Sequence, residues 1–394
     1  MVKRWISAAC ALLMLCMMLR TGAQAAELSV GPLEEKPPMR PDCASALLVE
    51  SGSGQIIFEW NADERRPVAS VTKIMTILLV VEALEEGRIH REDRVVISAN
   101  AAGMGGSQVL LDAGETQTVD VLLKSVIVGS ANDAAVALAE HLCGSVPLFV
   151  DRMNRRAAEL GMNDTNFVNA TGLPAEGHYT TARDVARMAM ALSGHEIYYE
   201  YSGIWLDEVV HESGRKTSLT NTNRLIRLYE GCDGLKTGST NEAGYCMAAT
   251  AKRAGMRLIA VVLGAATGKE RFEIASEMMD YGFAGYRMYP VSEKGAKIRG
   301  RLPVSGGSKE AVSVELDEDL TLLLRKGDEQ YVRLQANLPA YLTAPVRQGD
   351  PIGYVDVMLG ERVVAQVRVC ASESVGRQSF ADGLGRVLKL WCFQ

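Results

Sequence analysis

The chain has 394 residues, of which 47% are hydrophobic and 23% are charged. This composition is typical of folded domains and excludes a chain that is disordered throughout, and the length suits two or three domains. Lysine and arginine total 42 against 48 aspartate and glutamate, a net charge of −6. That balance argues against nucleic-acid binding, which needs a basic surface to neutralise phosphates. Five histidines and the lack of a Cys-x-x-Cys pair leave little material for a zinc site, so no metal and no other cofactor is expected.

Residues 1–25 are predicted to be a secretory signal peptide. Lys3 and Arg4 precede a short apolar run, and a small-x-small segment follows at Ala23 and Ala25. The run is too short to span a bilayer comfortably, because that takes about 20 residues. We therefore expect cleavage after Ala25 or one residue later, and export of the mature chain. An uncleaved membrane anchor is the alternative.

Six cysteines remain in the expected mature chain and are scattered along it: Cys43, Cys143, Cys232, Cys246, Cys370 and Cys392. Export would allow them to oxidise, but a chain of this size has no need of disulfide staples. Small buried thiols are the favoured interpretation, and no pairing is predicted.

The first strands and the first helix are the clearest elements. Residues 26–42 are expected to form an extended leader, and 44–50 with 55–60 form a strand–turn–strand pattern. From 70 to 84 the pattern predicts a helix whose apolar residues cover nearly every face. A helix of that kind is buried on all sides.

The remaining pattern predicts an α+β domain over residues 43–287. Further helices are expected at about 119–128, 132–142, 147–160, 181–192 and 269–284, and strands at 204–210, 234–240, 244–251 and 257–264. Strands at both ends of this stretch enclose a helical middle. This order predicts one antiparallel sheet with helices packed on it and an inserted helical lobe.

Two segments follow that domain. Residues 288–376 alternate in short runs broken by Gly and Pro, which predicts a small all-β domain. In residues 377–394, Phe380, Leu384 and Trp391 recur at helical spacing. We expect this amphipathic tail to lie in a membrane interface, and docking on its own domain is an equal alternative.

Three short motifs carry the chemistry, and the first is Ser70-Val-Thr-Lys73 at the start of the buried helix. A serine hydroxyl is a poor nucleophile unless a base removes its proton. Residues three apart share a helix face, so Lys73 can reach Ser70. Burial, with Lys236 as a second cation nearby, would lower the pKa of Lys73 and make it a base. A capping serine and a surface lysine are the alternative.

The other two motifs are Ser130-Ala-Asn132, between two helices, and Lys236-Thr237-Gly238, in a strand. A hydroxyl at Ser130 can pass a proton to a departing amine, and the Asn132 amide can hold a peptide carbonyl. Lys236 and Thr237 offer a cation and a hydroxyl to an anionic group.

Gly238 in a strand interior indicates the close approach of another backbone, such as a substrate peptide added at the sheet edge. The backbone N–H groups of Ser70 and Ser239 are candidates for an oxyanion hole.

These motifs and their flanks resemble the low-molecular-mass D-alanyl-D-alanine carboxypeptidases, which are serine penicillin-binding proteins. The segments that carry the resemblance are Ala69-Ser70-Val71-Thr72-Lys73, Gly105-Gly-Ser107, Ser130-Ala-Asn132-Asp133, Asn169-Ala-Thr-Gly172-Leu173, His178-x-Thr180-Thr181-Ala-x-Asp184 and Gly231-Cys-Asp-Gly234-Leu-Lys236-Thr237-Gly238. The likeness is close over residues 40–287, and looser over the β domain and the tail. It implies the transpeptidase fold shared by penicillin-binding proteins and β-lactamases.

The resemblance also implies an activity. Ser70 would attack the bond between the last two D-alanines of a peptidoglycan stem pentapeptide, Lys73 would take the proton, and Ser130 would pass one to the leaving D-alanine. Lys236, Thr237 and, at the family's arginine position, Arg271 would hold the terminal carboxylate. β-Lactams would acylate the same serine. The tail would hold the protein at the outer face of the cytoplasmic membrane.

Three other functions share some of these features. A β-lactamase is disfavoured by about 100 residues beyond the catalytic domain and by the lack of a Glu-x-x-Leu-Asn segment. A non-catalytic cell-wall receptor is disfavoured by the intact motifs. An endopeptidase that cuts D-alanyl cross-links would use the same residues, and the sequence leaves this alternative open.

Overall fold

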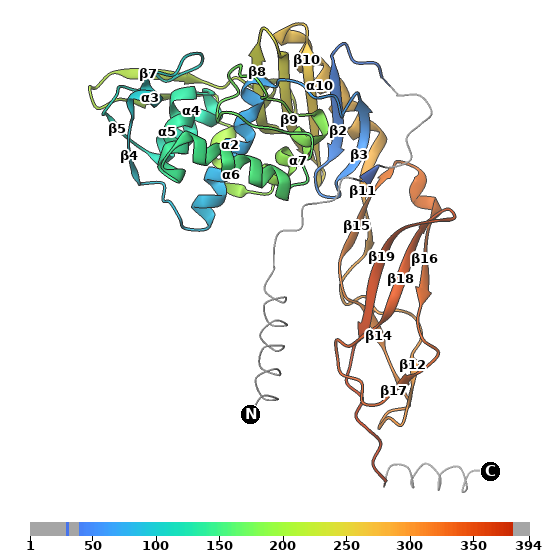
Figure 1. Ribbon diagram of the computed structural model, residues 1–394. Coiled ribbons are helices and arrows are strands. Elements are labelled where there is room, and N and C mark those ends of the chain that lie inside the picture. The colour runs from blue at the N-terminus through green and yellow to red at the C-terminus, as the bar shows by residue number, and fades with distance from the viewer. Residues whose placement is uncertain (1–28, 31–38, 381–394) are drawn as a thin grey trace, which may run out of the picture. The chain divides into compact units, whose positions relative to one another are not determined.

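The computed structural model describes residues 29–30 and 39–380, and the chain divides into two compact units between Gly282 and Phe283. The predicted signal peptide, most of the leader, Cys392 and residues 381–394 of the tail lie outside the described residues. Figure 1 shows the helices and strands of both units.

A six-stranded sheet forms the centre of the first unit, with the strand order β1-β3-β2-β10-β9-β8. Its strands are β1 (Ser29–Val30), β2 (Ser45–Glu50), β3 (Gln55–Trp60), β8 (Cys232–Thr240), β9 (Gly244–Arg253) and β10 (Met256–Ala265). All neighbours pair antiparallel except β1 with β3, which is parallel. Strand β8 has no strand partner on its outer side within the described residues. The α+β class is confirmed.

Helices cover both faces of this sheet, which explains why its central strands are continuously apolar. The helices are α2 (Lys73–Glu85), α3 (Ala99–Ala102), α4 (Val119–Val128), α5 (Asn132–Cys143), α6 (Val146–Glu159), α7 (Ala182–Ser193), α8 (Glu196–Ser202), α9 (Leu225–Leu228) and α10 (Gly268–Gly285). Leu47 and Val261 join the core cluster of α2 and α7. On the opposite face, Gly282 of α10 lies against Leu48 and Leu258.

Helix α2 is buried on every side, as its sequence predicts, and helices α3 to α6 form a lobe beside the sheet (Figure 1). Ser145 caps α6 and Thr181 caps α7, because each hydroxyl accepts a hydrogen bond from a backbone N–H of the first turn. The predicted lobe is therefore present, with helix bounds close to those expected.

Two expectations about local structure are wrong. Residues 70–72 were expected to belong to the long helix, but Ala69–Thr72 form a 3₁₀ turn (η1) and α2 begins at Lys73. This turn lies directly against β8, where Gly238 approaches Ser70 N. The strand at 204–210 does not join the main sheet, because β6 (Leu206–Val210) pairs only with β7 (Lys216–Thr220) as a separate hairpin.

Several short elements lacked a recognisable pattern. Besides β7, α3, α8 and α9, these are β4 (Arg94–Val96) and β5 (Thr116–Thr118), which pair with each other. Elements of three to seven residues are too short to show a clear period.

The second unit is built from strands around a core of valines, as the sequence predicts. Its strands are β11 (Tyr286–Ser292), β12 (Leu302–Ser305), β13 (Ala311–Val312), β14 (Val314–Leu316), β15 (Leu320–Arg325), β16 (Val332–Asn337), β17 (Leu342–Thr343), β18 (Pro351–Leu359) and β19 (Arg362–Ala371), with one 3₁₀ turn, η2 (Asp328–Tyr331). They form sheets of the order β11-β15, β13-β12-β17 and β14-β19-β18-β16. Val312, Val357 and Val369 are fully buried between them.

Among the described residues, no single helix has the length and hydropathy needed to cross a membrane, although α5 and α6, bent by 85°, pass that test as a pair. The five described cysteines (Cys43, Cys143, Cys232, Cys246 and Cys370) are free thiols.

The contact between η1 and β8 predicts the effect of a methyl group at Gly238. A Cβ there would lie 2.7 Å from Ser70 N, 2.8 Å from Val68 O and 2.9 Å from Val71 N, so Gly238→Ala must displace backbone. We expect a loss of about 1–3 kcal/mol in the free energy of unfolding. The control is Gly203→Ala, where a Cβ meets nothing within 4 Å, with an expected effect within about 0.5 kcal/mol. Equal losses in denaturant titrations of the two variants would contradict the close contact.

Candidate active site

The amine of Lys73 lies between the hydroxyl of Ser70 and the carbonyl of Thr171. Lys73 Nζ donates to Ser70 Oγ at 2.8 Å and to Thr171 O at 2.8 Å. The lysine side chain is completely buried (0% exposed), which confirms the expectation from the apolar pattern of α2. The 3₁₀ turn still places residues 70 and 73 on one side, because its repeat is three residues.

Burial lowers the pKa of Lys73 well below its ordinary value of 10.5. The cation of Lys236 adds to this lowering of the pKa, and the carboxylate of Asp133 opposes it. Burial also lowers the pKa of Lys236, to about 7, with a smaller contribution from the Arg271 cation. A buried amine without a carboxylate partner at contact distance favours its neutral form, which can accept a proton.

A turn at residues 168–173 packs against η1. Asn169 Oδ1 accepts hydrogen bonds from Thr171 N at 3.1 Å and from Gly172 N at 2.7 Å, which folds the turn around the asparagine side chain. Gly172 has a φ of +79°, and a Cβ on it would lie 1.8 Å from Ala69 O. Thr76 Oγ1 also donates to Ala170 O at 2.7 Å. The turn therefore holds the carbonyl of Thr171 against the amine of Lys73.

Ser130 and Asn132 lie at the start of α5 and keep polar atoms without partners. Ser130 has a φ of +60°, a conformation that strains a non-glycine residue and that clusters at functional sites. Ser130 Oγ and Asn132 Oδ1 are buried, and neither atom has a hydrogen-bond partner within the described residues. Asn132 Nδ2 donates to Gly105 O at 2.7 Å, which orients the amide. Buried polar atoms without partners are suited to receiving groups of a ligand.

Residues 236–239 lie on β8, at the edge of the main sheet. Lys236 is 1% exposed, and its Nζ contacts Thr237 O at 3.1 Å. The unpaired outer side of β8 leaves room for an added peptide strand. Another backbone does approach Gly238, as expected, and in the structure it is that of η1, around Ser70.

Arg271, from the start of α10, contacts the same strand. Its Nη1 donates to Gly238 O at 3.0 Å, while its Nε is buried and has no hydrogen-bond partner among the described residues. The guanidinium also lies over the rings of Tyr245 and Phe272, at 5.5 and 4.9 Å from their centroids. The arginine that the family resemblance implies therefore lies beside the motif strand.

The sequence motifs did not indicate two contributors to the site. The first is the backbone carbonyl of Thr171, which accepts a hydrogen bond from Lys73. Every residue has such a carbonyl, so the residue type does not reveal this role. Asp133 is fully buried and accepts hydrogen bonds from Val109 N at 3.0 Å and Leu111 N at 3.1 Å. It thereby fixes the segment that precedes the β5 strand next to Asn132. An aspartate in the first turn of a helix would otherwise be taken as a cap.

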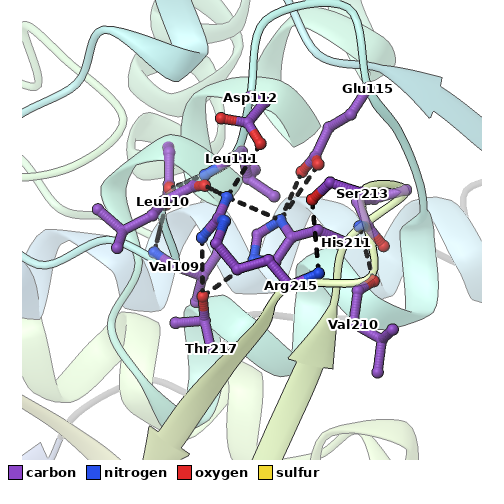
Figure 2. Close-up of polar contacts among 12 residues, drawn as sticks. Val109, Leu110, Leu111, Asp112, Glu115, Val210, His211, Ser213, Arg215 and Thr217 are labelled. Carbon is purple, nitrogen blue, oxygen red and sulfur yellow. Dashed lines mark hydrogen bonds and ion pairs between the residues drawn. The ribbon is translucent and has the colours of Figure 1, made fainter.

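A partly buried polar cluster joins the same segment to the β6–β7 hairpin (Figure 2). Asp112, Glu115 and His211 place oxygen and nitrogen atoms within 4.8 Å of one another, a spacing compatible with a metal ion. Arg215 occupies this place, because its Nη2 lies 3.0 Å from Asp112 Oδ2 and also donates to Leu110 O. His211 Nδ1 contacts Glu115 Oε1 at 3.0 Å. The cluster therefore ties the tip of the β6–β7 hairpin to residues 110–115.

Comparison with known proteins gives two family matches. Residues 33–267 match the family described as D-alanyl-D-alanine carboxypeptidase, and residues 286–377 match the C-terminal domain of penicillin-binding protein 5. The chain is 39% identical to D-alanyl-D-alanine carboxypeptidase DacF of Bacillus subtilis over 351 residues, which cover 89% of this chain and 90% of the relative. It is 33% identical to DacC of Escherichia coli over 88% of this chain and 86% of that protein.

Among solved structures, penicillin-binding protein 5 of Haemophilus influenzae is similar with a TM-score of 0.76 and 32% identity, over 87% of this chain and all (100%) of that one. Penicillin-binding protein D2 of Listeria monocytogenes, solved in an ampicillin-bound form, is similar over 63% of this chain and 100% of that chain, with a TM-score of 0.54 and 33% identity.

The turn beneath η1 predicts a severe effect of a methyl group at Gly172. Gly172→Ala combines a positive φ with a Cβ placed 1.8 Å from Ala69 O, whereas Gly87→Ala has a φ of +68° and no atom within 4 Å. We expect Gly87→Ala to cost about 1–2 kcal/mol of unfolding free energy from the φ penalty alone. Gly172→Ala should cost about 1–3 kcal/mol more, because the backbone of η1 must move. Denaturant unfolding measures both, and a smaller loss at Gly172 than at Gly87 would contradict the contact.

Proposed function

The chain belongs to the D-alanyl-D-alanine carboxypeptidase family of serine peptidases, which act in cell-wall metabolism, and from this premise we propose how its own residues perform the reaction. Ser70 is the nucleophile and Lys73 is its base. The observation that carries this assignment is the buried Lys73 amine, 2.8 Å from Ser70 Oγ and with a lowered pKa.

In the acylation step, neutral Lys73 Nζ accepts the proton of Ser70 as Oγ attacks the carbonyl between the last two D-alanines of a stem pentapeptide. Backbone N–H groups of Ser70 and Ser239 stabilise the negative oxygen that develops. Ser130 donates its proton to the nitrogen of the departing D-alanine and takes up the proton that Lys73 accepted, and the C–N bond breaks. Water then hydrolyses the ester on Ser70 and releases the shortened stem peptide.

The terminal carboxylate of the substrate is held by Lys236, Thr237 and Arg271. A buried lysine beside a half-buried arginine favours the arrival of an anion, because it neutralises charge that the described part of the protein leaves uncompensated. Arg271 Nε lacks a partner in the described residues and is available to such a group. Asn132 binds a carbonyl or amide of the peptide, and the substrate backbone lies along β8 with Gly238 at its closest point to η1.

β-Lactams imitate the D-alanyl-D-alanine terminus in this proposal and acylate Ser70. The relative crystallised with ampicillin supports this, since it shares the fold at 33% identity. A non-catalytic receptor would have no use for a lysine kept neutral by burial. Cleavage of D-alanyl cross-links is the second activity that the same residues could support.

We also propose the organisation given by the sequence: a signal peptide over residues 1–25, a leader over 26–42, a catalytic domain over 43–287, a β-rich domain over 288–376 and a membrane-binding tail over 377–394. The protein would then be exported and act at the outer face of the cytoplasmic membrane. The pattern of the tail, with Phe380, Leu384 and Trp391 on one helical face, supports this location.

The function is tested by incubating the protein with a peptide that ends in D-Ala-D-Ala and measuring released D-alanine. A cross-linked dimer of the same stem peptide, supplied in parallel, measures endopeptidase activity. Release from the monomer with the dimer left intact identifies a carboxypeptidase. Cleavage of the dimer alone, or of neither substrate by protein that binds penicillin, would contradict the proposal.

The roles of Ser70 and Lys73 predict the behaviour of their alanine variants. Ser70→Ala should abolish covalent labelling by a fluorescent penicillin, and Lys73→Ala should slow labelling by about 10²–10⁴-fold, the usual contribution of a general base. The control is Lys124→Ala, which removes a lysine paired with Asp207 at 2.7 Å and should label normally. In the unsubstituted protein, the acylation rate should fall as the pH drops through the pKa of Lys73, well below 10.5. Persistent labelling of Ser70→Ala would remove Ser70 as the nucleophile.

The proposed tail predicts a change in membrane association. Deletion of residues 378–394 should move the protein from the membrane pellet to the supernatant, because the apolar face that enters the interface is lost. Penicillin labelling of the truncated protein reports that the catalytic domain is intact. Unchanged sedimentation of labelled, truncated protein would show that the tail is a structural element.

A further inference from the structure

His178 is a buried, titratable side chain to which the reaction described above assigns no part. Its ring is 8% exposed and lies between η1 and the turn at residues 168–173. His178 Nε2 lies 2.8 Å from Thr72 Oγ1, and His178 Nδ1 accepts a hydrogen bond from Val168 N at 3.1 Å. One imidazole therefore joins the two segments that surround the amine of Lys73.

The backbone of Val168 determines the tautomer of this ring. A backbone N–H can only donate, so Nδ1 must be unprotonated, and the proton of the neutral ring is on Nε2, which donates to Thr72 Oγ1. Burial lowers the pKa of His178 to about 4, so the ring stays neutral at neutral pH. Phe167 packs against it edge-on, with ring centroids 5.8 Å apart.

Both partners of the imidazole belong to segments that carry atoms of the proposed catalytic site. Thr72 lies between Ser70 and Lys73 in the chain, and Val168 begins the turn that presents Thr171 O to Lys73 Nζ at 2.8 Å. Gly172 of the same turn lies directly against Ala69 O. A shift of the turn relative to η1 would therefore change the position of the acceptor of Lys73.

The segment that carries His178 is itself anchored. Tyr179 and Asn166 exchange backbone hydrogen bonds of 2.9 and 3.1 Å, and Thr180 and Arg66 exchange bonds of 2.8 and 3.0 Å. The ring is therefore carried by a segment that is bonded to the chain just before the turn, at Asn166, and to the chain just before η1, at Arg66.

We propose that His178 is a positioning residue, which fixes the distance between η1 and the 168–173 turn and so holds the Thr171 carbonyl and the Ser70 hydroxyl at the Lys73 amine. This inference rests on the role proposed for Lys73. The tie is made by hydrogen-bonding atoms on opposite sides of a rigid ring, so a side chain that fills the space without those atoms does not replace it.

The test compares three variants in the full chain. His178→Leu removes both hydrogen bonds, Thr72→Val removes only the one to Nε2, and His178→Gln keeps an acceptor for Val168 N and a donor for Thr72 Oγ1 on a single amide. Phe149→Leu, at a fully buried position in α6, is the control for lost stability in general. The measurements are the limiting acylation rate and the binding constant for a fluorescent penicillin, with the thermal midpoint of each variant.

We expect His178→Leu to lower the limiting acylation rate by about 10- to 100-fold with little change in the binding constant, because misplacement of a reacting group by about 1 Å costs up to about 10²-fold. His178→Gln should recover most of the rate. An equal loss of rate in Phe149→Leu, or a His178→Leu protein that is folded and acylates normally, would overturn the proposal.

A second measurement does not depend on activity. Nitrogen-15 spectra of the unsubstituted protein should show His178 with its proton on Nε2 and a bare Nδ1, and this signal should change in Thr72→Val. The opposite tautomer, or no change in Thr72→Val, would overturn the proposal even if His178→Leu does not fold. Failure of the roles of Ser70 and Lys73 is distinguishable, because it would appear in the penicillin labelling of their own variants.

Discussion

The structure depends on one buried amine, that of Lys73, which has no carboxylate in contact with it among the described residues. A lysine removed from water is costly in its charged form, and a protein usually answers by pairing it or by releasing its proton. Here the contacts of Lys73 Nζ are a hydroxyl and a carbonyl, each at 2.8 Å. Neither carries a charge, so burial makes the neutral amine more stable. Because no counter-ion stabilises its charged form, Lys73 favours the neutral form, and this form can act as a base.

Two glycines of the site allow other backbone segments to approach η1 closely. Gly238 brings β8 against Ser70 N, and Gly172 brings the 168–173 turn against Ala69 O. Both approaches are closer than any Cβ would allow. The nucleophile turn is thus held between a strand and a turn, and Ala69, with a φ of +49°, adopts the backbone strain that this fit requires.

The sequence predicts those elements whose pattern of apolar and polar side chains shows which faces are buried. Helix α2 is apolar on every face, so the burial of Lys73 could be foreseen, and α4, α5 and β8 have strong patterns of their own. What the sequence could not predict depends on backbone contacts. The 3₁₀ form of Ala69–Thr72, the carbonyl of Thr171 and the true neighbour of Gly238 arise from packing between segments far apart in the chain. The β6–β7 hairpin was misplaced for a related reason, because alternation identifies a strand but not its partner.

Three neighbouring basic groups in this site lie in environments that act differently on their charge, and this difference separates their roles. Arg271 stays charged at any working pH, and its charge contributes to the lowering of the pKa of Lys236 to about 7. Burial is the larger cause of the lowered pKa of Lys73, and the charge of Lys236 adds to it. The guanidinium of Arg271 and the ammonium of Lys236 suit an anionic substrate group, whereas the neutral amine of Lys73 suits proton transfer. Groups of the same charge type, placed in environments that move their pKa values apart, thus divide binding from catalysis.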